Sequence, residues 1–166
     1  MLFRSLSAVS LYGDVPAKEQ PVKEGHAWNP VGVRGVVSQS VLDLLAAYRS
    51  LHSVEFTALA LGNVYGPRQR PEAGVVAAFA SALLDGTVPV LHGDGRQTRD
   101  FVHVDDTVDA LVRAAHKASG LVVNIGTGVA TSVRDLWNVM AGSGAKRPTT
   151  APRRSDADPF LIRRPP

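Results

Sequence analysis

The chain has 166 residues, 45% of them hydrophobic and 20% charged, so it can bury one core but not two full domains, and it is not a disordered protein. The absence of cysteine, of a long apolar run and of a signal core in MLFRSLSAVS excludes disulfides and thiolate metal sites and predicts a soluble cytoplasmic protein without a membrane partner. The net charge of +3 arises in residues 146–166, which hold six Lys or Arg and two Asp, so we expect a basic, proline-rich tail and no nucleic-acid partner.

The first predicted elements are a strand, a loop and a helix. Residues 2–11 are small and apolar and predict a core strand that ends at Tyr12-Gly13. The alternation of strand side chains would point Ser7 and Ser10 away from the face of Ala8. Residues 14–30, rich in Pro, Lys and Glu, predict a surface loop. A helix is predicted from about residue 35 to 51, because these apolar residues fall at helical spacing: Val37, Val41, Leu44, Leu45 and Tyr48.

The middle of the chain predicts two strands on either side of a second helix. Residues 54–60 alternate as a strand does and lead into GNVYGPRQ at residues 62–69. The helix between them has one apolar face, and Gly86 is its expected C-terminal stop. The apolar face consists of Val75, Val76, Phe79 and Leu83. Residues 88–91 predict a short strand after this helix.

The most informative stretch is HGDGRQTRDFVHVDD at residues 92–106. Its glycines predict a tight turn, residues 101–104 a buried strand, and Asp105 or Asp106 the cap of the next helix. The turn holds Arg99, whose planar guanidinium suits bidentate binding of a phosphate or carboxylate. An ion pair of Arg99 with Asp94 or Asp100 is an equally simple alternative.

The last predicted elements are a strand, a glycine turn and a helix. Residues 121–125 enter Gly126-Thr127-Gly128, and Ser132 with Asp135 predicts a capping box for a helix that runs through Met140. The glycines are similar to a dinucleotide fingerprint, but Thr131 replaces the third glycine and no acidic residue follows about twenty positions later. We therefore interpret this segment as a structural turn. No histidine pair has metal-ligand spacing, so no metal site is expected.

Three motifs carry a family resemblance: GNVYGPRQ, GDGRQTRDFVHVDD and the NIGTG of residues 124–128. In this order they resemble the NAD-dependent sugar-nucleotide epimerases and dehydratases, the extended short-chain dehydrogenase/reductases, and UDP-glucose 4-epimerases are the most similar type. The resemblance covers nearly the whole chain but only the later part of the family's length. It implies an α/β fold with the later strands of an incomplete Rossmann-type doubly wound sheet plus a substrate-binding subdomain.

The resemblance also implies a site for a UDP- or dTDP-hexose. Arg99 and Asn63 match residues that contact the nucleotide diphosphate, and His92 lies where the family places an aromatic residue beside the nucleobase. Asn63 could instead form an Asx-type turn, and His92 could be an ordinary loop residue. The remaining candidates for substrate binding are Val76, and Arg153 with Asp156, whose spacing charged tails also produce.

The family's catalytic positions hold other residue types. Family members carry a Tyr acid/base with a Lys four residues later, in a segment like SPYGVSK, and a Ser or Thr near the end of the preceding strand. An ungapped alignment places Arg34 at the Tyr, Ser38 at the Lys and Ala8 at the hydroxyl residue. Arg34 has no phenolic proton and Ser38 no positive charge, so we expect that no catalytic residue is intact.

The resemblance places the nucleotide fingerprint and the first βαβ units before Met1. Residues 1–145 are therefore expected to form a partial epimerase/dehydratase domain that does not bind NAD alone, and residues 146–166 to form the tail. The missing strands would expose a sheet edge and apolar helix faces. An upstream Rossmann half or a homodimer would suit these surfaces as a partner.

Three hypotheses for function follow. The first is an NAD-dependent, UDP-glucose 4-epimerase-like protein of which this chain is a truncated and inactive form. The second is a fragment like dTDP-glucose 4,6-dehydratase, although Ala8-Val9 does not supply the acidic residues that this chemistry needs after the first strand. The third is a non-catalytic, nucleotide-sugar-binding half of a split protein. The residues favour an inactive remnant over an active enzyme.

Overall fold

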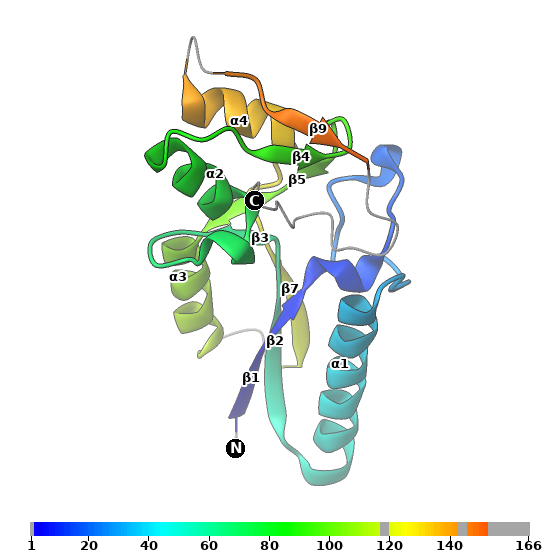
Figure 1. Ribbon diagram of the computed structural model, residues 1–166. Helices are drawn as coiled ribbons and strands as arrows, with labels where there is room; N and C mark the ends of the chain where they lie inside the picture. Colours follow the sequence, from blue (N-terminus) through cyan, green and yellow to red (C-terminus); the bar gives the residue numbers. More distant parts are fainter. Residues whose placement is uncertain (1, 117–119, 143–145, 153–166) are drawn as a thin grey trace. The chain divides into compact units, whose positions relative to one another are not determined.

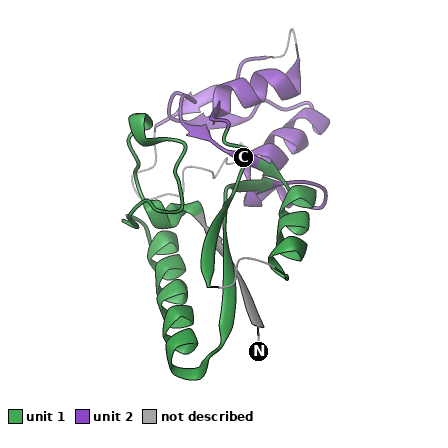
Figure 2. Ribbon diagram, turned by 180° about the vertical axis from the view of Figure 1, so that it is seen from behind, with its two compact units in different colours: residues 1–64, 102–128 green, residues 65–101, 129–166 purple. Residues whose placement is uncertain are grey.

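The computed structural model describes residues 2–116, 120–142 and 146–152, with the backbone alone for residues 2–8. The chain divides into two compact units (Figure 2). Unit 1 comprises Met1–Val64 and Val102–Gly128, and unit 2 comprises Tyr65–Phe101 and Val129–Pro166. The chain passes between the units inside GNVYGPRQ, inside GDGRQTRDFVHVDD and directly after NIGTG, so none of these crossings lies at residue 145.

Unit 1 is built on a parallel sheet of three strands in the order β1-β2-β7 (Figure 1). The strands are β1 (Leu2–Ala8), β2 (Glu55–Leu61) and β7 (Leu121–Ile125), with Leu2 opposite Glu55 and Thr57 opposite Leu121. Helix α1 (Val33–His52) connects β1 to β2, and α3 (Val104–Ala114) precedes β7. Parallel strands joined through helices confirm the predicted partial Rossmann-type fold.

Strand β2 is buried on both faces, which differs from the alternation predicted for residues 54–60. Its five central residues, Phe56–Ala60, are all buried. The physical reason is its place as the central strand, with α1 and α3 on opposite sides of the sheet (Figure 1).

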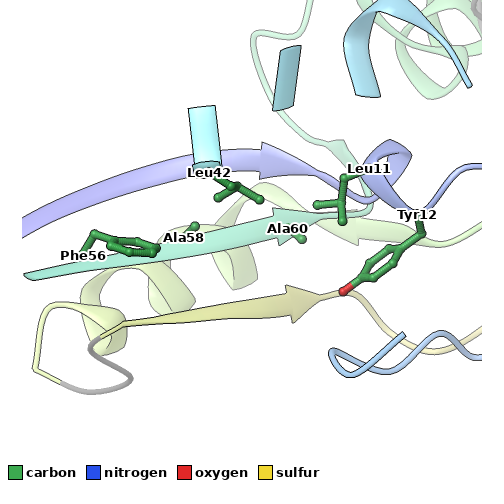
Figure 3. Packing of buried hydrophobic residues seen from close by; sticks show 6 residues of the cluster. All are labelled: Leu11, Tyr12, Leu42, Phe56, Ala58 and Ala60. Carbon is green, nitrogen blue, oxygen red and sulfur yellow. The ribbon is translucent and has the colours of Figure 1, made fainter. Parts of the chain in front are cut away.

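The main core of unit 1 lies where α1 covers the sheet (Figure 3). Leu42 from α1 packs with Phe56, Ala58 and Ala60 from β2, and with Leu11 and Tyr12. The last two belong to a 3-10 helix, Val9–Tyr12, so β1 ends three residues earlier than predicted. The expectation for Ser10 is wrong, because it lies in the 3-10 helix, and in a strand it would share the face of Ala8, two positions earlier.

The opposite side of α1 carries an exposed apolar stripe. Val37, Val41, Leu44, Tyr48 and Leu51 are all exposed, at successive spacings of four and three residues. Strand β1, at one end of the strand order, has one open edge among the described strands. The predicted exposure of a sheet edge and an apolar helix face is therefore present in the described part of unit 1.

The start of α1 packs tightly on the 3-10 helix at Gly35. A Cβ atom at Gly35 would lie 2.5 Å from the Ser10 carbonyl oxygen and 2.8 Å from Pro30 Cβ. We expect Gly35→Ala to lower the free energy of unfolding by about 1–3 kcal/mol through overpacking, although alanine favours helices. Gly25→Ala, where a Cβ meets nothing within 4 Å, is the matched control. Urea unfolding measures both, and a Gly35→Ala protein as stable as the unsubstituted chain would contradict this packing.

Unit 2 has its own core between two helices. Phe79 of α2 (Val75–Leu84) and Trp137 of α4 (Val133–Ala141) meet edge to face, with ring centroids 5.0 Å apart. Val75, Leu91 and Val133 complete the buried cluster. Among the described residues, four short strands border this core: β4 (Val90–His92) pairs with β9 (Thr149–Ala151), and β5 (Thr98–Arg99) with β8 (Thr131–Ser132).

Residues 146–152 belong to the fold of unit 2, contrary to the expectation of a tail that starts at Lys146. Strand β9 runs parallel to β4, with Leu91 opposite Thr150. The indole N–H of Trp137 donates to the carbonyl of Lys146 at 3.2 Å. The composition of a Pro- and Arg-rich segment did not reveal that its first residues complete a two-stranded sheet.

Two of the predicted helix ends are confirmed and one is wrong. Ser132 caps α4, because its hydroxyl accepts from the N–H of Asp135 at 3.0 Å. Gly86, at φ 64°, ends α2 with the paired bonds Gly86 N–H to Leu83 O and Thr87 N–H to Ala82 O. Helix α3 is capped by the His103 ring and not by Asp105 or Asp106. Over the described ranges, no helix is both long and apolar enough to cross a membrane.

Candidate functional site

Arg99 lies in unit 2 on β5, between the glycine turn and β6 (Phe101–His103). One guanidinium nitrogen donates to the Thr98 carbonyl at 2.6 Å, and the residue is half-buried. Asp94 forms an ion pair with Arg96 at 3.6 Å. The alternative of an ion pair of Arg99 with Asp94 or Asp100 stays a prediction. The N–H of Arg96, which donates to Asp94, lowers the pKa of that carboxyl.

The beginning of α2 is an open helix N-terminus. Gly74 is its N-cap and supplies no side-chain hydrogen bond. In the part of the chain that the structure describes, the N–H groups of Val75, Val76 and Ala77 find no acceptor, since the first bond runs from Ala78 to the Gly74 carbonyl. Unsatisfied N–H groups and the helix dipole favour an anion at such an end. Val76, a predicted site residue, lies in this first turn.

Val76 also lines a hollow of about 400 Å³ inside unit 2. Tyr65, Arg68 and Gln69 form one side of it, and the exposed face of α2 as far as Leu84 forms the other. Arg68 has a positive φ of 67°, a conformation that costs free energy in a residue other than glycine. The hollow therefore combines an aromatic ring, a cation and an apolar helix face.

Helix α4 has a closed N-terminus, in contrast to α2. Val133 N–H donates to the Gln97 carbonyl at 3.1 Å, and Arg134 N–H to the Gly95 carbonyl at 3.0 Å. Asp135 N–H donates to the Ser132 hydroxyl oxygen. No N–H group of this turn is left for a pyrophosphate, which agrees with the prediction of a structural turn at residues 126–131.

His92 ends β4 with its ring partly buried. Its Nδ1 lies 3.4 Å from the carbonyl oxygen of Pro152, and its Nε2 is buried without a hydrogen-bond partner among the described residues. His92 therefore belongs to a strand and not to a loop. Its contact with a nucleobase stays a prediction. Arg153 and Asp156 lie outside the described residues.

Asn63 belongs to unit 1 and begins strand β3 (Asn63–Tyr65), which pairs with β6. Its side chain is half-buried and makes no hydrogen bond to the described residues. The alternative of an Asx-type turn requires a bond from this side chain to nearby backbone, and that bond is absent here. Contact of Asn63 with a nucleotide diphosphate stays a prediction.

Arg34 and Ser38 lie four residues apart in the first turns of α1, on one face of the helix. Arg34 is exposed and Ser38 half-buried. Ala8 is the last residue of β1. The structure places Arg34, Ser38, Ala8 and Asn63 in unit 1, and Val76, His92 and Arg99 in unit 2. In the described ranges no group of three or more His, Asp or Glu side chains could hold a metal ion.

A hydrogen-bonded network at the end of β7 was missed by sequence reasoning. The Tyr12 hydroxyl donates to Asn124 Oδ1 at 2.8 Å, and Asn124 Nδ2 donates to the Val22 carbonyl at 3.0 Å. The backbone N–H of Asn124 donates to the Glu24 carboxylate, also at 3.0 Å. Tyr12 and Asn124 both fall in motifs, but no local signal links residues 112 positions apart.

Burial raises the pKa of the Tyr12 phenol, the bond to Asn124 opposes this, and the charge of Glu24 adds to it. A raised pKa in the folded state means that stability is complete below the unfolded value of 10.0 and is lost as pH rises through the folded pKa. We expect Tyr12→Phe to reduce the alkaline loss of unfolding free energy, measured by urea unfolding between about pH 8 and pH 11. The half-exposed Tyr48 supplies the control variant Tyr48→Phe. Identical pH dependence in Tyr12→Phe and the unsubstituted chain would contradict the expectation.

Sequence comparison identifies relatives of this chain. A family profile described as the NAD dependent epimerase/dehydratase family matches residues 2–126. A UDP-glucose 4-epimerase of Mycolicibacterium smegmatis is 46% identical over 142 residues, which cover 82% of this chain and 44% of that protein. The chain thus spans less than half the length of this relative.

Solved structures give the same family. A UDP-glucose 4-epimerase of Thermotoga maritima with UDP-glucose has a TM-score of 0.87 and 35% identity, covering 93% of this chain and 51% of that chain. A UDP-glucose 4-epimerase of Thermus thermophilus in complex with NAD has a TM-score of 0.84 and 31% identity, covering 94% of this chain and 53% of that chain. With a profile match over most of its residues, the chain belongs to the NAD dependent epimerase/dehydratase family.

Proposed function

We propose that this chain is a catalytically silent member of its family that binds the diphosphate of a UDP- or dTDP-hexose and does not epimerise the sugar. The observation that carries the proposal is the pair Arg34 and Ser38 on one face of α1, at the place where the resemblance puts the Tyr and Lys. Arginine stays protonated near neutral pH, and serine supplies no charge that would lower the pKa of a neighbouring base. The face can hold an anion but cannot take a proton from a sugar hydroxyl.

Two features of unit 2 and one of unit 1, each taken by itself, support binding of a diphosphate. Arg99 follows a glycine turn and is fixed by its pairing with Thr131 of β8. The first turn of α2, with Val76, presents N–H groups without acceptors in the described chain. Asn63 has an amide that makes no hydrogen bond to the described residues. Each of these groups favours an anionic or polar ligand.

The residues present do not fit NAD by themselves. The strand–glycine turn–helix that is most similar to a dinucleotide site runs from β7 to α4, and the first N–H groups of α4 all donate to protein atoms. We therefore propose that NAD is not bound by this chain alone. No observation favours the dehydratase hypothesis over the epimerase-like one.

The open edge of β1 and the apolar stripe of α1 support a need for a partner. Water exposure of these surfaces costs free energy, since parallel sheets are normally covered and large apolar patches normally bind a partner. The surfaces are the edge of β1 and five apolar residues of α1. A complementary Rossmann half would add strands at β1, while a second copy would cover the stripe. We propose the complementary half, because an open edge of a parallel sheet pairs with further strands.

The proposal is tested by two measurements on the purified chain: UDP-glucose turnover with added NAD, and UDP affinity by calorimetry. Binding without turnover supports it. Turnover would refute the silent site, and absence of saturable UDP binding would refute the diphosphate site.

A further inference from the structure

Residues 14–30 form a loop that is held along its length by unit 1. Its middle contacts Asn124, through the bonds of that residue to the Val22 carbonyl and the Glu24 carboxylate. Its end returns to the 3-10 helix, where Asn29 N–H donates to the Leu11 carbonyl at 3.1 Å. Val15, Val22 and Trp28 also pack against the core cluster of this unit. The surface loop expected from composition is confirmed, and it is also anchored.

Asn124 uses every polar group of its side chain in this anchoring. Oδ1 accepts from Tyr12 and Nδ2 donates to Val22, so an amide is required and a carboxylate would place an acceptor against a carbonyl. Tyr12 is itself fixed, since its ring is buried and meets His26 of the loop at a centroid distance of 6.1 Å. Figure 3 shows the Tyr12 hydroxyl at the end of β7, where Asn124 lies.

The loop leads directly into the first turn of α1. Pro30 follows the anchored Asn29 and lies against Gly35, which in turn lies against the Ser10 carbonyl. Gly32, the N-cap of α1, supplies no side-chain bond, so the helix start depends on the segment before it. The chain path therefore connects Asn124 to the turn that carries Arg34.

We propose that Asn124 is a positioning residue: it holds the 14–30 loop across the ends of β1 and β7 and, through the loop, fixes the first turn of α1. That this turn faces a bound sugar nucleotide rests on the proposed function. That Asn124 fixes the turn rests on the hydrogen bonds alone.

Amide hydrogen exchange at three positions, measured by NMR on the full chain at neutral pH, separates the possibilities. His26 N–H, bonded to the Lys23 carbonyl, reports on the loop. Val36 N–H, bonded to the Gly32 carbonyl, reports on the first turn of α1. Ala78 N–H, bonded to the Gly74 carbonyl, is the matched reference in unit 2, because α2 also begins at a glycine without a side-chain cap.

Asn124→Asp keeps the size of the side chain and the acceptor for Tyr12, but removes the donor to Val22 and adds a charge beside Glu24. We expect exchange at His26 and Val36 to rise at least about tenfold, and exchange at Ala78 to stay within about twofold. Tyr12→Phe removes one hydrogen bond and keeps the ring. It should raise exchange at the same two amides, His26 and Val36, by a smaller factor. Asn138→Asp, the same change at an exposed position of α4, should change none of the three.

Faster exchange at His26 with Val36 unchanged would overturn the proposal, because the loop would then be held by Asn124 without positioning α1. An equal rise at all three amides would overturn it as well, since Asn124 would then contribute only to overall stability. The proposed function is tested separately by UDP affinity. If the unsubstituted chain does not bind UDP, the proposed function fails while the exchange pattern still decides the role of Asn124.

Discussion

Purified chain supplied with UDP-glucose and NAD is expected to form no UDP-galactose above the uncatalysed background. Loss of a general acid/base alone lowers a rate by about 10²- to 10⁴-fold. Here Arg34 and Ser38 occupy both positions of the expected Tyr and Lys pair, and Ala8 occupies that of the hydroxyl residue. The N–H groups of the α4 turn are also unavailable to a dinucleotide. Chromatographic separation of the two UDP-sugars measures the product.

The Mycolicibacterium smegmatis relative, assayed under the same conditions, is the positive control. Arg34→Ala and Ser38→Ala provide the internal test, since a silent site should be unaffected by either change. Product formed by the unsubstituted chain and abolished by Arg34→Ala would contradict the account, because it would make Arg34 part of a working site. A complex with a complementary half should stay inactive unless Arg34→Tyr and Ser38→Lys are both introduced.

Elements with strong local signals could be predicted from the sequence. The capping box of Ser132 and Asp135 and the glycine stop of α2 depend on residues within five positions of one another, and both are present. Helix α1 follows from its apolar spacing and begins two residues before the predicted start. The order of the three motifs predicted the family, and the family resemblance predicted the parallel sheet.

Features that depend on distant residues could not be predicted. The Tyr12–Asn124 bond joins the 3-10 helix after β1 to strand β7, and only the folded sheet brings these two segments together. Strand β9 forms from residues whose composition is typical of a tail, because they pair with the edge of β4. Histidine is a rare N-cap, so the His103 cap was hidden by the two aspartates that follow it.

Arg99→Ala is expected to weaken UDP binding by about ten- to a hundredfold, because a charge-assisted contact of this kind contributes about 1.5–3 kcal/mol. Arg99 follows a glycine turn and lies in a strand pair with Thr131, so little conformational freedom is lost on binding. The affinity is measured by calorimetry at fixed ionic strength, since screening weakens all charge contacts.

Arg96→Ala is the matched control. Arg96 lies in the glycine turn three residues before Arg99, carries the same charge, is highly exposed and pairs with Asp94. Its removal changes the net charge as Arg99→Ala does and is expected to change UDP affinity less than about threefold. A general electrostatic attraction would weaken equally in both variants.

Titrating UDP into the unsubstituted chain, Arg99→Ala and Arg96→Ala in one calorimetric series shows whether the proposed diphosphate site exists in a chain that lacks the family's catalytic Tyr and Lys. We predict saturable one-site binding to the unsubstituted chain and to Arg96→Ala, and much weaker binding to Arg99→Ala. Equal affinity in all three proteins, or no saturable binding by the unsubstituted chain, would show that the diphosphate site has been lost together with the catalytic residues.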